Sequence, residues 1–207
     1  MEKFRNKYRI PSARLKSWDY GWNGSYFVTI CTKYRQHLFG KIFDHEMYFN
    51  SKGKIALDCW CEIPDHFDFV NLGEYVIMPN HVHGIINIVK PIQTVVETTH
   101  ALSLPLTHAL SLPLSHALPI QNSPKPKHSR FQNPGKSTIS SIVGSYKSAV
   151  TKLINREYEQ GKIILSKFEW QGRFHDHVIR SEKEYQRISE YIKNNYKNWK
   201  QDKFYNG

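Results

Sequence analysis

Two apolar runs separated by a tight turn constrain the fold of this chain more than any other feature. Residues 69–78 and 81–89 are rich in β-branched and aromatic side chains, and Pro79-Asn80 between them is a turn dipeptide. Only antiparallel neighbours can be joined by so short a connection. We therefore expect a β-hairpin, and the rest of the fold must be built around it.

The second strand of this hairpin carries two histidines in the stretch MPNHVHG. Because side chains alternate along a strand, His81 and His83 project from one face and Val82 projects from the other. Two imidazoles on one face form half of a site for a divalent metal ion. On spacing alone, the alternative is a pair of half-exposed histidines near a turn.

The rest of the chain supplies further helices and strands. We expect a strand at 26–32, a helix at 46–62, a turn at 65–68, an amphipathic helix from Thr138 to near Gly161, a short strand at 163–168 and a last helix that opens with a Ser181/Glu184 capping box. This mixed order with antiparallel pairing predicts an α+β fold. The best match is a ferredoxin-like antiparallel sheet with helices packed on one face.

A tandem repeat divides the chain. The octapeptide THALSLPL occurs twice and begins a third time within residues 91–136. Two proline-interrupted copies cannot stack into a repeat architecture, so we expect a long, disordered, low-complexity insertion loop there. We interpret residues 1–24 as a basic, aromatic N-terminal arm and residues 25–207 as a single domain interrupted by this loop.

The chain is strongly basic, with a formal net charge of +11 and a pI of about 9.5. The positive charge lies mainly in residues 1–41 and 136–207. Such flanks suit a polyanion, most simply nucleic acid, and Trp18, Tyr20 and Trp22 could stack on unpaired bases. The alternative is a basic protein without such a partner, in which these aromatic rings pack.

No run of about 18 apolar residues is present, so we expect no membrane span. The N-terminus lacks the apolar stretch of a secretory signal. The three cysteines fit a reducing compartment better than a disulfide scaffold, and Cys59 and Cys61 lack the spacing of a zinc site. We therefore expect a cytoplasmic protein.

Several enzyme classes that use paired histidines are excluded. An amidohydrolase barrel needs about 250 residues and eight βα units. A metalloprotease carries H-E-x-x-H on a helix, which this chain lacks. A cupin-like site needs a glutamate soon after the pair, and none occurs before Glu97. Enzymes in which a metal positions a phosphodiester for attack remain.

Two stretches resemble a known family. YVIMPNHVHGII (75–86) resembles the HUH motif of single-tyrosine transposases, and WQGRFHDHVIRSEKEYQRISEYIKNN (170–195) is similar to the C-terminal block of REP-associated tyrosine transposases. With the strand at 26–33, the resemblance covers most of the chain outside the repeat loop. It implies a DNA transposase or nickase that acts on single-stranded, hairpin-forming repeats through a covalent 5′-phosphotyrosine, with Mg²⁺ or Mn²⁺ held by His81 and His83.

The resemblance also implies roles for single residues. Tyr191 matches the nucleophile and Asn195, one helical turn later, matches a third metal contact; Tyr185 and Tyr196 fall on the apolar stripe of the same helix. Candidate DNA contacts, which could equally be solvated surface or helix-bracing groups, are Lys147, Lys152, Arg156, Arg173, His177 and Arg180.

Alternative functions remain open from the sequence. The chain could be a catalytically inactive protein that binds single-stranded or hairpin DNA, or a metal-dependent phosphodiesterase in which water attacks. Both a monomer and a homodimer are compatible with the sequence.

Overall fold

The computed structural model describes residues 3–4, 7–8, 14, 18–91, 135, 137–161 and 167–205. The octapeptide repeats, nearly all of the expected insertion loop and most of the expected strand at 163–168 lie outside these residues. Within the described ranges, no helix is both long enough and apolar enough to cross a bilayer.

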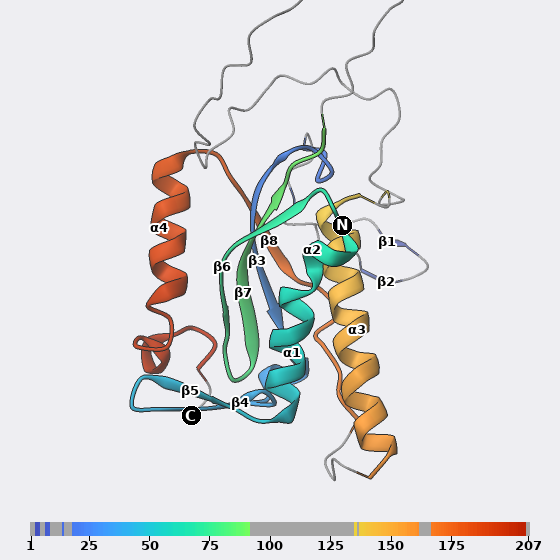
Figure 1. Ribbon diagram of the computed structural model, residues 1–207, viewed down its shortest axis with the longest axis vertical. Helices are drawn as coiled ribbons and strands as arrows, with labels where there is room; N and C mark the ends of the chain where they lie inside the picture. The colour runs from blue at the N-terminus through green and yellow to red at the C-terminus, as the bar shows by residue number, and fades with distance from the viewer. Residues whose placement is uncertain are drawn as a thin grey trace, which may run out of the picture.

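A four-stranded antiparallel sheet forms the centre of the fold (Figure 1). Its strands are β3 (Gly24–Cys31), β6 (Val70–Ile77), β7 (His81–Ile88) and β8 (His175–Ile179), in the spatial order β6-β7-β3-β8. Helix α1 (Ser51–Cys61) follows β3, and helix α3 (Ile139–Glu159) follows β7. This β-α-β-β-α-β order is ferredoxin-like, which confirms the predicted α+β class.

Further elements surround this core. They are the strand pairs β1 (Lys3–Phe4) with β2 (Lys7–Tyr8) and β4 (Gly40–Phe43) with β5 (Glu46–Phe49), the short helix α2 (Ile63–His66), the helix α4 (Glu182–Lys193) and the 3₁₀ turns η1 (Lys33–Arg35) and η2 (Trp199–Gln201).

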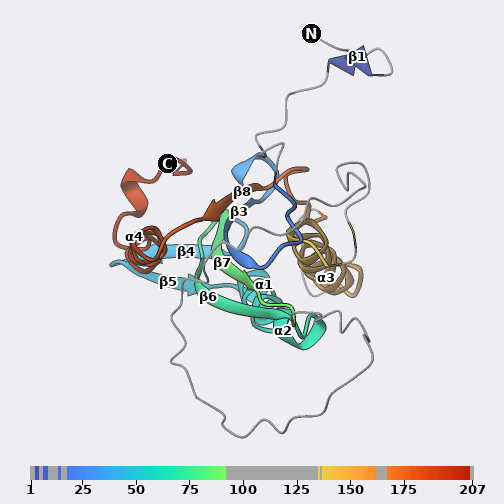
Figure 2. The same ribbon diagram turned by 90° about the horizontal axis from the view of Figure 1, so that it is seen from above.

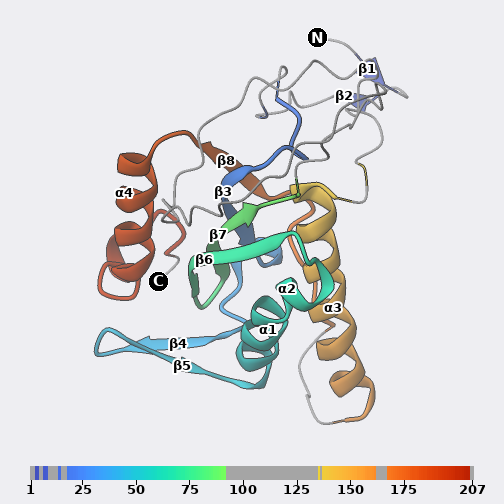
Figure 3. The same cartoon turned by 45° about the horizontal axis from the view of Figure 1, so that its top comes forward.

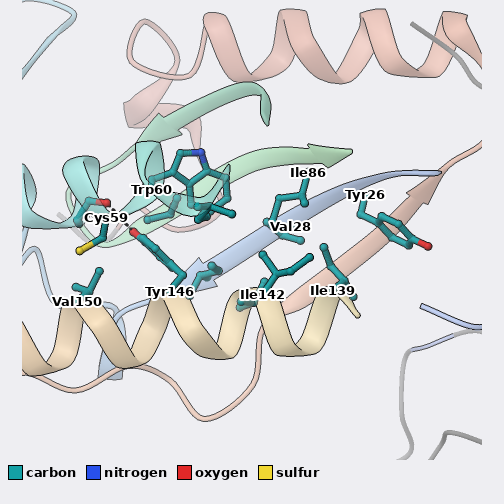
Figure 4. Close-up of a cluster of buried hydrophobic side chains, with 14 of the residues drawn as sticks. Tyr26, Val28, Cys59, Trp60, Ile86, Ile139, Ile142, Tyr146 and Val150 are labelled. Atoms are coloured by element: carbon teal, nitrogen blue, oxygen red, sulfur yellow. Dashed lines mark hydrogen bonds between the residues drawn. The ribbon is translucent and has the colours of Figure 1, made fainter. Parts of the chain in front are cut away.

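Helices lie on both faces of the sheet (Figures 2 and 3). Helices α1 and α3 cover one face, as expected, and pack on Val28, Val82 and Ile86 (Figure 4). Helix α4 covers the other face, where Ile188 and Ile192 pack in one cluster with residues such as Ile85. Residues two apart on a strand point to the same face of the sheet. His81 and His83 therefore lie on the same face as Ile85, which is the face under α4.

Gly84, the glycine of MPNHVHG, allows α1 to approach the sheet closely. A Cβ atom built on Gly84 would lie 2.2 Å from the indole ring of Trp60, which is fully buried. The indole therefore occupies the space above the backbone of β7. The residue after the histidine pair thus has a packing role that is independent of metal chemistry.

The expected helix at 46–62 and the expected turn at 65–68 both differ in the structure. Residues 46–49 form β5, and α1 begins only at Ser51, because Asn50 caps it by accepting a hydrogen bond from the backbone N–H of Gly53 at 3.0 Å. The expected turn at 65–68 overlaps α2.

The fourth strand is β8, later in the chain than the expected strand at 163–168. Of that stretch, the structure describes Lys167 and Phe168, and neither lies in a strand. Strand β8 is an edge strand, paired only with β3, and its first three residues, His175–His177, are polar and at least partly exposed. An apolar run was therefore a poor guide to its position.

Candidate functional site

The two histidines of β7 lie side by side beneath α4. Their ring centroids are 4.4 Å apart, and both side chains are buried. Strand β7 lies inside the sheet, between β6 and β3, which fixes the backbone under both imidazoles. The expectation that His81 and His83 share one face is met, but they are buried, unlike the half-exposed pair of the alternative interpretation.

Each imidazole is oriented through its Nδ1 atom. Nδ1 of His81 donates to Oδ1 of Asn80 at 2.7 Å, and Nδ1 of His83 lies 2.9 Å from the hydroxyl of Thr29. Asn80 is itself fixed, because its amide nitrogen donates to the backbone carbonyls of Phe204 at 2.8 Å and Arg35 at 3.1 Å. Such contacts orient both rings and use only their Nδ1 atoms.

Tyr191 brings its hydroxyl to this pair. The phenolic oxygen lies 3.2 Å from Nε2 of His83, and the Tyr191 ring packs edge-on against Phe27, which stacks on His83. The residue is still 42% exposed. Tyr196, by contrast, donates its hydroxyl to the backbone carbonyl of Ile77. Of these two tyrosines of the C-terminal segment, Tyr191 is the one that contacts a histidine of the pair.

Asp202 adds a carboxylate that the sequence did not suggest. It follows η2, accepts a hydrogen bond from the backbone N–H of Phe204 at 2.7 Å, and places Oδ2 3.4 Å from the Tyr191 hydroxyl. Candidate ligand atoms of His81, His83 and Asp202 all lie within 4.8 Å of one another. Asp202 stands in a polar segment without periodicity, so only the folded chain reveals it.

Asn195, the expected third ligand, follows the end of α4. Its side chain is buried, and among the described residues neither polar atom of its amide makes a hydrogen bond of normal geometry, although the amide is near enough to Tyr191 to affect its pKa. Within the same part of the chain, Nε2 of His81 also lacks a hydrogen-bond partner. Buried polar atoms without partners are costly, and a bound cation would give such atoms a partner. The two imidazoles and the carboxylate of Asp202 are groups that could hold a divalent metal ion.

Burial sets the protonation of these groups. It lowers the pKa of His83 to about 3 and that of His81 well below its ordinary value, so both imidazoles are neutral at pH 7. Burial also raises the pKa of Tyr191; the Asn195 amide opposes this shift, and the carboxylate of Asp202 adds to it. The site therefore holds two neutral imidazoles beside a protonated phenol.

The candidate DNA contacts are spread over two regions. Lys147, Lys152 and Arg156 line one groove beside α3. His177 and Arg180 lie at the end of β8, where Glu184 holds the imidazole of His177 at 2.8 Å and the backbone N–H of Arg180 at 2.9 Å. Glu184 thereby links α4 to β8. Because its carboxylate accepts from the backbone N–H of Arg180, it does not complete the predicted capping box with Ser181, whose side chain still accepts from the N–H of Glu184.

Arg173 and the aromatic arm were also candidates for DNA contact. Arg173 is exposed in the segment between α3 and β8. Tyr20 is buried and packs against Tyr26, whose hydroxyl accepts a hydrogen bond from the indole N–H of Trp18 at 3.2 Å. Trp22 packs edge-on against Trp18. The rings of Trp18, Tyr20 and Trp22 therefore pack against other aromatic side chains of the protein.

Sequence comparison identifies the relatives of the chain. The family described as "Transposase IS200 like" matches residues 124–195. An uncharacterized protein of Haemophilus influenzae is 36% identical over 194 residues, which cover 94% of this chain and 92% of that protein. The chain belongs to the IS200-like transposase family. The matched range of this transposase family contains Tyr191 and Asn195 but not β7, so it is the fold that brings the histidine pair to the matched segment.

A solved structure is also similar to this IS200-like transposase. It is a REP-associated tyrosine transposase bound to a REP hairpin, with 16% identity, a TM-score of 0.48, and coverage of 94% of this chain and 74% of the other. At that level of similarity, the assignment to the family rests on the sequence matches.

Proposed function

We propose that this IS200-like transposase cleaves and rejoins single-stranded DNA at hairpin-forming repeats, with Tyr191 as the nucleophile and a divalent cation held by His81, His83 and Asp202. The observation that carries the proposal is the contact between the Tyr191 hydroxyl and Nε2 of His83. A nucleophile beside the candidate ligands is the arrangement that phosphoryl transfer requires.

Each residue then has a defined task. The Tyr191 oxygen attacks the scissile phosphorus and the bond to the 3′ oxygen breaks, which leaves a 5′-phosphotyrosine and a free 3′-OH. Because Tyr191 is 42% exposed, the phenolic proton can pass to water. His81, His83 and Asp202 would hold the cation, with the Asn195 amide as a further donor. A bound cation would neutralise the charge that develops on the phosphate oxygens.

The covalent link explains how such an enzyme could also rejoin DNA. A phosphotyrosine conserves the free energy of the broken phosphodiester, so attack by a 3′-OH can reverse the step without ATP. The candidate ligands and Tyr191 all come from one chain. A monomer would therefore suffice for cleavage.

The test is an adduct assay. The protein is incubated with labelled single-stranded DNA that contains a hairpin, in Mg²⁺ or Mn²⁺, and then denatured. We expect a labelled band at the mass of protein plus DNA, and its loss in EDTA. Cut DNA without the adduct would indicate attack by water, and hairpin binding without any product would indicate an inactive binding protein. Either outcome contradicts the proposal.

A further inference from the structure

Helix α4 covers the sheet unevenly on the face that carries the histidine pair. It packs mainly on β6 and β7, so the half of this face formed by β3 and β8 is less closely covered. Tyr191 lies at the border between the two halves, because its hydroxyl contacts His83 of β7 and its ring packs edge-on against Phe27 of β3. A substrate strand can therefore reach Tyr191 over β3 and β8.

Three side chains form a row across the sheet at the level of this contact. Thr29 is the register partner of His83 on β7 and of His175 on β8. Directly opposed residues of antiparallel strands project from the same face. The face is that of the site, because the hydroxyl of Thr29 lies 2.9 Å from Nδ1 of His83. His175 therefore projects from the face on which Tyr191 lies, two strands away from His83.

The side chain of His175 is available for chemistry. It is exposed and makes no hydrogen bond to any other described residue, whereas His177, the next residue of β8 on this face, is held by Glu184 at 2.8 Å. Burial and then the charge of Lys203 lower the pKa of His83, and the charge of His175 adds to this shift, so His175 lies within electrostatic range of the site. An exposed imidazole can exchange protons with water near neutral pH.

The direction of attack places the leaving group on the side of His175. In phosphoryl transfer the attacking and leaving oxygens lie roughly in line. Because Tyr191 approaches from α4, the leaving 3′ oxygen points away from α4, over β3 and β8. The approach of the nucleophile, one P–O bond and a hydrogen bond to a general acid together span about 8 Å. Strand β8 lies two strand spacings from β7, about 10 Å, which matches this span.

We propose that His175 is the general acid that protonates the 3′ oxygen of the DNA strand as it leaves. This inference rests on the proposed function. As the bond from the Tyr191 oxygen to phosphorus forms and the bond to the 3′ oxygen breaks, the proton on the His175 imidazolium passes to that oxygen. In the rejoining step the neutral imidazole takes the proton from the attacking 3′-OH while the phosphotyrosine bond breaks. Without a proton donor, the leaving group would be a strongly basic alkoxide.

Replacement of the leaving oxygen by sulfur tests this role. The cleavage site is first mapped with unmodified, labelled hairpin DNA, and the same DNA is then made with a 3′-bridging sulfur at that site. A thiolate is a much weaker base than an alkoxide, so it leaves without a proton donor. The variant is His175→Gln, and the matched control is His66→Gln, which changes an exposed histidine of α2. Lys203→Gln tests the other cation that affects the pKa of His83.

The readout is the single-turnover rate of strand cleavage by the full chain in Mn²⁺. We expect His175→Gln to cut the oxygen substrate about 100-fold more slowly than the parent protein, but the sulfur substrate within about threefold of the parent rate. His66→Gln should match the parent on both substrates. Equal losses on both substrates would show a binding or structural role and would overturn the proposal. An undiminished rate on the oxygen substrate, or rescue by sulfur of Lys203→Gln in place of His175→Gln, would overturn it as well.

Metal affinity and adduct formation separate this inference from other failures. Because His175 is exposed, His175→Gln should bind Mn²⁺ with the parental affinity in calorimetry, and a tenfold loss of affinity would overturn the direct role. A parent protein that cuts DNA without an adduct would refute Tyr191 as the nucleophile, yet the comparison of oxygen with sulfur would still decide the role of His175. A parent protein that cuts neither substrate would refute both proposals.

Discussion

The hydroxyl of Tyr191 lies 3.2 Å from Nε2 of His83, although 108 residues separate them in the chain. The contact exists because β7 presents His83 on the face of the sheet that α4 covers. Nε2 is the atom that a metal would use, since Nδ1 is already engaged by Thr29. The hydroxyl of Tyr191, the candidate nucleophile, therefore contacts the nitrogen atom through which His83 would bind a metal ion.

Asn80 should act as a positioning residue for the cation. It accepts the hydrogen bond from Nδ1 of His81 and is held in turn by the carbonyls of Phe204 and Arg35. We expect Asn80→Ala to weaken Mn²⁺ binding by about 10-fold or more, as measured by calorimetry, because His81 loses its fixed orientation. Asn71→Ala, which changes an exposed asparagine of β6, is the matched control. Equal affinities in the two variants would refute the role.

Asp202 should contribute more to cation binding than Asn195. A carboxylate brings charge to the cation, whereas an amide brings only a dipole. Asp202→Asn should therefore reduce Mn²⁺ affinity by about 10-fold to 100-fold, with a smaller loss for Asn195→Ala. Glu190→Gln, an exposed change on α4, should have no effect. If Asn195→Ala has the larger effect, the sequence resemblance identified the third ligand better than the carboxylate cluster does.

The stability of the metal-free protein should fall as the solution becomes acidic. Burial lowers the folded-state pKa of His83 to about 3, whereas the unfolded chain titrates near 6.5. Below pH 6.5 the unfolded state therefore binds a proton that the native state does not, and the stabilising contribution is lost as the pH falls toward 3. Between pH 7 and pH 5 the loss from His83 is about 2 kcal/mol.

Urea unfolding at both pH values in EDTA measures this loss. His83→Gln should flatten the pH dependence, whereas His66→Gln, which changes an exposed residue of α2, should leave it unchanged. An identical pH dependence in His83→Gln and the parent protein would contradict the assignment.

Gly84 should be intolerant of a side chain for reasons of packing. In Gly84→Ala the new methyl group would lie 2.2 Å from the ring of Trp60, so the helix or the strand must move. We expect a destabilisation of about 1–3 kcal/mol in urea unfolding. Gly144→Ala is the contrasting control, since nothing lies within 4 Å of its Cβ position on α3 and alanine favours a helix. A stable Gly84→Ala variant would show that α1 packs less tightly than the structure indicates.

Local sequence patterns predicted the positions of His81 and His83 but not that of Asp202. Alternation and the Pro79-Asn80 turn were sufficient to place His81 and His83 on one face, because strand geometry dictates that face. The family resemblance singled out Tyr191 within its helix. Asp202 could not be found in the same way, because it reaches the site only after the chain beyond α4 turns back toward the sheet. The periodicity of polar and apolar residues does not indicate where a chain turns back in this way.

The β4–β5 hairpin was missed for a different reason. Its strands are short, and the turn uses Asp44 and His45 with φ values of 47° and 63°. Aspartate and histidine tolerate the left-handed region better than most residues do, but the pair lacks the glycine that usually marks such a turn. The sequence consequently predicts that residues 46–49 belong to the helix that follows them.

Adduct formation by Tyr191→Phe and Tyr185→Phe, measured side by side, decides whether Tyr191 is the nucleophile. Both changes remove one hydroxyl from α4, but only that of Tyr191 contacts His83. With labelled hairpin DNA and Mn²⁺, we expect a covalent adduct for Tyr185→Phe at the wild-type level and none for Tyr191→Phe. An adduct of undiminished intensity from Tyr191→Phe would contradict it.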